Sequence, residues 1–120
     1  MYRLATLLIF LCACGSDPTI EIVSFPSDTT DTEGPYQVEV VPTPNDPDEL
    51  ASLELEVTFL PEESNAISDF DPVDGSSTWS ALIAGRPAGT TVQFRVKLVE
   101  SDGTLIREPT EEPLSFRILE

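Results

Sequence analysis

The sequence predicts an all-β domain, a single antiparallel β-sandwich of seven strands that follows a cleaved export signal. Three observations support this prediction. Eleven prolines are spread through the chain, and a proline inside a helix costs roughly 3 kcal/mol. Beyond the first residues no apolar stripe has the helical period, whereas apolar and polar residues alternate repeatedly over short segments. Turn sequences such as Gly34-Pro35, Asp74-Gly75 and Asp102-Gly103 separate these segments.

The two clearest strands are expected at residues 53–60 and 91–99, where every second residue is apolar. The other strands are expected at residues 19–25, 36–41, 67–73, 78–84 and 114–119. We expect Pro42, Pro44 and Pro47 to keep the connection between the second and third strands out of any sheet. Trp79 alternates with the apolar residues of its strand, so we expect it in the core rather than on a sugar-binding surface.

The first residues predict an export signal. Arg3 supplies a positive charge, and residues 4–11 form an apolar run in which Thr6 is the only polar member. Such a run suits the core of a signal peptide and is too short to span a bilayer, which needs about 20 residues. We therefore expect a signal peptide at residues 1–13, a short tether at residues 14–18 and the sandwich domain at residues 19–120.

The run ends in Leu11-Cys12-Ala13-Cys14, which resembles the lipobox of bacterial lipoproteins. The resemblance implies cleavage before Cys14 and attachment of diacylglycerol to its sulfur, so that the lipid anchors an exported protein to a membrane of the bacterial cell envelope. Gly15 stands where an aspartate would retain an enterobacterial lipoprotein at the inner membrane, which favours the outer membrane. Cys12 departs from the pattern, in which alanine, serine or threonine is commoner. The alternative is an ordinary secretory signal that leaves Cys14 as a free thiol.

The segment from Trp79 to Gly103, with Pro87-Ala88-Gly89-Thr90 and the alternating Val92-Gln93-Phe94-Arg95-Val96, resembles immunoglobulin-like and fibronectin-type-III-like modules of bacterial envelope proteins. The resemblance implies that strands 53–60, 91–99 and 114–119 share one sheet. The chain departs from antibody domains because it lacks the cysteine pair of their inter-sheet disulfide.

If the apolar residues of those strands face the core, five charged residues share the outer face of that sheet: Glu54, Glu56, Arg95, Lys97 and Arg117. This face is interpreted either as a mixed-charge docking patch for a protein partner or as a solvated face with ordinary ion pairs. Open edges at the first and last strands also permit a partner to add a strand.

The charge balance restricts the possible functions. There are 22 acidic and 6 basic residues, no histidine, and a net charge of −16. Nucleic acids are not expected as partners, because their phosphates require clustered lysine and arginine. Without histidine the chain lacks the usual general base, so we expect no enzyme. The acidic segment 27–33 is expected to be mobile.

Asp69, Asp71 and Asp74 precede Gly75 in the acidic loop 69–75 and are candidate calcium ligands, although their spacing differs from that of an EF-hand loop. No other cofactor is expected. The sequence thus predicts a non-catalytic, membrane-proximal structural or protein-binding module. A calcium-dependent binding domain is the alternative, and a small envelope enzyme is a third.

Overall fold

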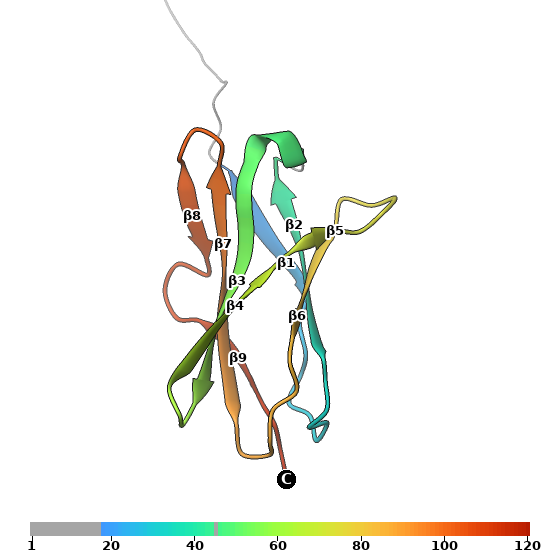
Figure 1. Ribbon diagram of the computed structural model, residues 1–120, viewed down its shortest axis with the longest axis vertical. Helices are drawn as coiled ribbons and strands as arrows, with labels where there is room; N and C mark the ends of the chain where they lie inside the picture. The colour runs from blue at the N-terminus through green and yellow to red at the C-terminus, as the bar shows by residue number, and fades with distance from the viewer. Residues whose placement is uncertain (1–17, 45) are drawn as a thin grey trace, which may run out of the picture.

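The computed structural model describes residues 18–44 and 46–120, which form two antiparallel β-sheets packed face to face (Figure 1). One sheet has the order β1-β2-β6-β5, with β1 at Thr19–Ser24, β2 at Tyr36–Thr43, β6 at Trp79–Ile83 and β5 at Asp71–Pro72. The other has the order β4-β3-β7-β8, with β4 at Ser64–Asp69, β3 at Leu50–Leu60, β7 at Thr91–Glu100 and β8 at Leu105–Glu108. The ninth strand, β9 at Leu114–Arg117, also pairs with β7, and a short 3₁₀ turn, η2 at Pro47–Glu49, precedes β3.

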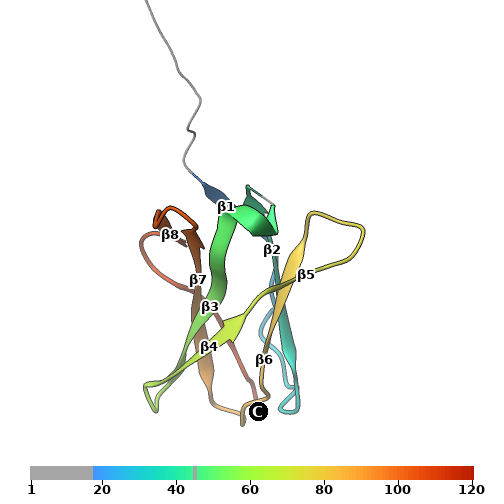
Figure 2. The same ribbon diagram turned by 45° about the horizontal axis from the view of Figure 1, so that its top comes forward.

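The predicted β-sandwich is therefore confirmed in its layers, with nine strands instead of seven within these ranges. Figure 2 shows the two sheets as separate layers, joined where β4 continues into β5. The predicted signal peptide, Cys14 and the tether as far as residue 17 lie outside the described residues. Within the described ranges no helix has the length and apolar character needed to cross a membrane.

The core is built by the alternation that the sequence displays in β3 and β7. Leu55 and Val57 on β3, and Phe94 and Val96 on β7, are buried between the sheets. Trp79 is 7% exposed, so its prediction as a core residue is confirmed. Alternating burial along a strand arises because successive side chains point to opposite faces of a sheet.

Pro42 lies inside β2, opposite Ile20 of β1, so the prediction that it stands outside any sheet was wrong. The pairing of β2 with β6 covers Tyr36 to Val40 and has ended before Pro42. Beside Pro42, the side of β2 that faces away from β1 therefore has no neighbouring strand. A proline is tolerated at such an edge, because no backbone N–H is needed for a ladder on that side.

The strand expected at residues 67–73 consists of two short strands in different sheets. β4 pairs with β3, and β5 pairs with β6. Phe70 stands at the crossing, buried in the core, and its N–H donates to Leu53 O at 3.0 Å. The chain changes sheet here because Phe70 anchors it between the layers.

The final predicted strand, at residues 114–119, is shorter in the structure and is preceded by the unpredicted β8. β8 and β9 follow one another along the same edge of β7. Pro109 and Pro113 occur between them, and neither can donate a backbone hydrogen bond to a ladder.

The acidic segment 27–33, for which the sequence predicted mobility, is joined to the end of the chain by hydrogen bonds. Thr29 N donates to Arg117 O at 3.0 Å. Asp28 accepts hydrogen bonds from the backbone and the guanidinium of Arg117. The Tyr36 hydroxyl donates to Asp31 O at 2.6 Å. These bonds close the end of the sandwich that carries the C-terminus in Figure 1.

Candidate docking face

The outer face of the β3–β7 pair is the surface on which the sequence predicted a charged docking patch. The register places Glu54 opposite Lys97 and Glu56 opposite Arg95. All four side chains point away from the core, because the residues between them on each strand are buried. The structure therefore brings four of the five predicted residues together.

Two ion pairs cross this face. Lys97 Nζ lies 3.8 Å from Glu54 Oε1. Glu56 pairs with Arg107 of β8 instead of with its neighbour Arg95, and Arg107 Nε lies 2.9 Å from Glu56 Oε1. The hydrogen bond and the charge of Glu56 raise the pKa of Arg107. Exposed pairs of this kind contribute little to stability, because solvent and salt screen them.

Arg107 was not identified in the sequence, because its strand was not predicted. A signal existed, since two aliphatic residues, Leu105 and Ile106, follow the turn at Asp102-Gly103, and a turn of this type between apolar segments indicates a hairpin. The guanidinium of Arg107 reaches over β7 to β3, about 10 Å at a spacing of roughly 4.8 Å between strands.

Arg95 holds the connection between β8 and β9. Its Nε donates to Pro109 O at 3.2 Å, and its Nη2 donates to Glu111 O. This irregular connection lacks the backbone ladder of a strand, so the guanidinium supplies hydrogen bonds that its carbonyls would otherwise require from water. The Arg95 guanidinium therefore stabilises the connection between β8 and β9.

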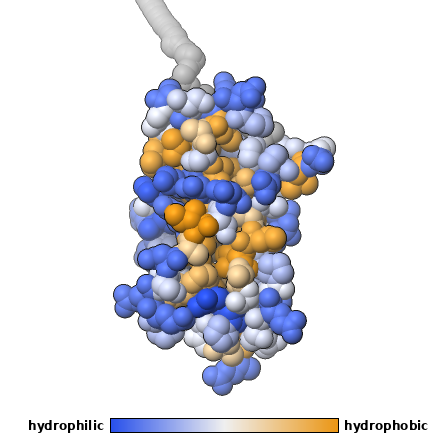
Figure 3. Space-filling model, in the orientation of Figure 1, coloured by the Kyte–Doolittle hydropathy of each residue, from blue (hydrophilic) through white to orange (hydrophobic). Residues whose placement is uncertain are grey.

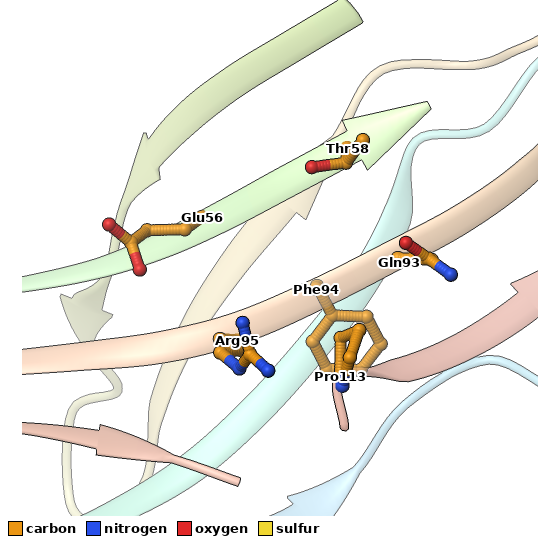
Figure 4. A pocket seen from close by; sticks show the side chains of 6 residues that line it. All are labelled: Glu56, Thr58, Gln93, Phe94, Arg95 and Pro113. Atoms are coloured by element: carbon orange, nitrogen blue, oxygen red, sulfur yellow. The ribbon is translucent and has the colours of Figure 1, made fainter. Parts of the chain in front are cut away.

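A shallow pocket of about 220 Å³ opens beside Arg95 (Figure 4). It is lined by Glu56 and Thr58 of β3, Gln93, Phe94 and Arg95 of β7, and Pro113. The polar groups that reach it are a carboxylate, a hydroxyl, an amide and a guanidinium, of which three already have partners in the protein.

Arg117, the fifth predicted residue, stands apart from the other four. It lies on β9 opposite Thr91, four positions along β7 from Arg95, which is about 13 Å at roughly 3.3 Å per residue. Its guanidinium pairs with Asp28, whose carboxylate oxygen is 3.0 Å away. Hydrogen bonds from the Arg117 backbone and side chain hold the pKa of Asp28 below its ordinary value. No sequence pattern links these residues, which are 89 positions apart.

The three candidate calcium ligands are not gathered around one point. Asp69 ends β4 opposite Glu54, Asp71 lies on β5 opposite Ser80, and Asp74 lies in the turn that follows β5. Across residues 18–44 and 46–120, no group of three acidic, cysteine or histidine residues is placed to hold a metal ion.

The basic residues of the described chain are all engaged inside the protein. Their partners are Glu62 for Arg86, two loop carbonyls for Arg95, Glu54 for Lys97, Glu56 for Arg107 and Asp28 for Arg117. The charge presented to other molecules is therefore dominated by the carboxylates that remain.

In comparisons with known proteins, the chain matches neither a protein-family model nor a curated protein sequence.

Proposed function

We propose that this protein is a non-catalytic lipoprotein of the bacterial cell envelope, whose β-sandwich binds a protein partner close to the membrane. The observation that carries the proposal is the apolar run 4–11 that ends in Leu11-Cys12-Ala13-Cys14. A signal of this kind supplies the Cys14 sulfur for acylation, and two or three acyl chains hold a protein firmly at a membrane. The residue after Cys14, Gly15, favours the outer membrane.

The strand order supports an immunoglobulin-like assignment for the domain. The sheet β1-β2-β6-β5 corresponds to strands A, B, E and D of such folds, and β3 and β7 with β8 and β9 correspond to C, F and G. Domains of this class frequently serve as binding modules, and the function is argued from the surface rather than from the fold.

The position of the first strand supports a membrane-proximal orientation. β1 begins at Thr19, at the end of the sandwich that carries η2 and the β7–β8 turn (Figure 1). A tether of residues 14–18 spans about 15 Å when extended. The end that faces the headgroups would then carry Asp48, Glu49 and Asp102. Their charge disfavours contact with anionic lipids within a Debye length of about 8 Å, so the acyl chains provide the attachment.

Replacing Cys14 tests the anchor. We expect the wild-type protein in the membrane fraction, with the mass of a lipid-modified cysteine on its N-terminal peptide, and the Cys14→Ser variant outside that fraction. The matched control is Cys12→Ala, which keeps a small residue within the motif and should remain lipidated. A bare thiol at Cys14 in the wild-type protein, or an uncut leader, would refute the proposal.

A further inference from the structure

The edges of the two sheets differ in how they are protected against pairing with another chain. β1 has a bulge between Ile22 and Ser24 and lies against β8. β5 is two residues long and one of them is Pro72. The β8–β9 edge is interrupted after Glu108, and Thr29 pairs with the chain end beside β9. Bulges, prolines, short strands and covering segments are the means by which proteins prevent edge-to-edge association.

β4 is an edge of the described chain with neither a bulge nor a proline, although it contacts β6 as β1 contacts β8. Its six residues contain no proline, and its register with β3 is continuous from Ser64 to Asp69. Residues 64–67 are exposed. Because Phe70 N donates to Leu53 O, the alternation of an antiparallel ladder directs the backbone groups of Ala66 toward β3 and those of Asn65 and Ile67 outward. Donors and acceptors of the backbone are thus presented to solvent along this edge.

Exposed aliphatic side chains accompany these backbone groups. Ile67 is 64% exposed, and Leu82 of β6 is 52% exposed. β4 approaches β6 where the Ser68 hydroxyl donates to Leu82 O at 2.8 Å. Figure 3 shows apolar surface in the middle of the face that β4 crosses, between hydrophilic bands. A strand added beside β4 would cover Ile67 on one face of the extended sheet.

The charge around β4 is negative. Asp69 ends the strand, and Glu62 and Glu63 form the turn before it. Arg86 reaches this turn from the segment after β6, and its guanidinium is paired with Glu62 at 2.8 Å. A second copy of this chain would bring the same carboxylates and a second net charge of −16 to the edge, whereas a cationic segment complements them.

We propose that β4 binds an extended segment of a protein partner that alternates aliphatic with lysine or arginine residues, and that this segment continues the sheet beyond β4. The inference rests on the proposed function of protein binding and assigns that function to the β4 edge instead of the β3–β7 face. Backbone hydrogen bonds from Asn65 and Ile67 provide affinity, and the alternating side chains provide selectivity. The β3–β4 turn lies at the end of the sandwich opposite the start of β1 (Figure 1), and therefore away from the end at which the described chain begins.

The experiment uses the full chain as isolated from cells, and the probe is a capped octapeptide of alternating valine and lysine. Amide NMR should show saturable shifts along β4 and slower hydrogen exchange at Asn65 and Ile67. The matched control peptide replaces lysine by glutamate and should bind at least tenfold more weakly.

The variant Ile67→Pro removes an outward N–H without removing a bond to β3, and should weaken peptide binding about tenfold or more. Ile67→Thr keeps a residue that favours a strand and should weaken peptide binding several-fold. This variant tests the proposal if the proline variant does not fold. The control is Val23→Thr, because Val23 is an exposed β-branched residue on the β1 edge, and it should bind the peptide as the wild type does.

Several results would overturn the proposal: no saturable binding, binding unaffected by Ile67→Pro, preference for the glutamate peptide, or a stable dimer of the chain through β4 at physiological salt. Shifts confined to Glu54 and Lys97 would also overturn it, while leaving protein binding at the β3–β7 face intact. The lipid anchor is tested separately at Cys14, so failure of the edge and failure of the proposed function are distinguishable.

Discussion

Replacing Gly85 by alanine tests how the end of the sandwich opposite Thr19 is closed. Gly85 follows β6 and lies against the end of the 27–33 segment. A Cβ added at Gly85 would lie 2.3 Å from Glu33 O and 2.6 Å from Thr32 O. Both are backbone atoms, and the Glu33 N–H is itself held by the Asp31 carboxylate at 2.8 Å. The clash therefore cannot be relieved by rotating a side chain.

Two effects of opposite sign determine the magnitude. Inserting one carbon into such a contact forces a backbone shift that costs typically about 1–3 kcal/mol. Alanine also restricts the unfolded chain, which stabilises the folded state by about 0.4–1 kcal/mol when no strain arises. The net expectation is a loss of roughly 1–2 kcal/mol, and at roughly 4–8 °C per kcal/mol for a domain of this size the melting temperature should fall by about 5–15 °C.

The assay is thermal and urea unfolding followed by the fluorescence of Trp79, which is buried in the core. The control is Gly75→Asn, since Gly75 has a φ of +77° with no atom within 4 Å of an added Cβ, and asparagine tolerates that backbone conformation. Its melting temperature should change little. A Gly85→Ala variant that melts at or above the wild-type temperature would show that the approach of Gly85 to Glu33 is not part of the fold.

Three further variants test other parts of the structure. Tyr36→Phe removes a hydroxyl that bonds two backbone groups, so urea unfolding should show a loss of about 1–2 kcal/mol, and an unchanged midpoint would contradict this. Because hydrogen bonds from Arg117 lower the pKa of Asp28 from 3.8, the stabilisation by that carboxylate is present above pH 3.8 and is lost as the pH falls through the lower folded value. The stability difference between the wild type and Asp28→Asn should therefore shrink in acid, and a constant difference would oppose the assignment. Calorimetric titration with calcium should show no saturable site, whereas saturable binding that is lost in Asp71→Asn would favour the calcium-dependent alternative.

The central strands β3 and β7 could be predicted because the alternation that marks them lies within each strand's own sequence. In β3 and β7, apolar and polar residues alternate because one face of each strand is buried. Both the core residues and the outward charged residues could therefore be predicted from the sequence. That Glu54 and Lys97 share one face followed from the pairing of the two strands, whereas their direct opposition also depends on the register. β8 contains just four residues, so its alternation alone was too short to indicate a strand, and its sequence signal was the Asp102-Gly103 turn before it.

The remaining contacts depend on where the chain returns in space. The change of sheet at Phe70 was not visible, because a single residue separates β4 from β5 and no turn sequence stands between them. The pairing of Asp28 with Arg117 depends on the path of the loop that brings them together. Similarly, the partner of Glu56 could not be named from the sequence, because Arg107 lies on β8, which was not predicted.

The negative charge around β4 compensates for its open edge. An open edge ordinarily promotes self-association, and the carboxylates around β4 oppose it, because four of the five described basic residues are already paired with carboxylates within each molecule. Repulsion of this kind is screened when the Debye length falls to about 3 Å near 1 M salt. Sedimentation should then detect dimers of the wild-type protein at high salt and monomers of Ile67→Pro. If both proteins dimerise equally under these conditions, charge is not what keeps the edge free for a cationic partner.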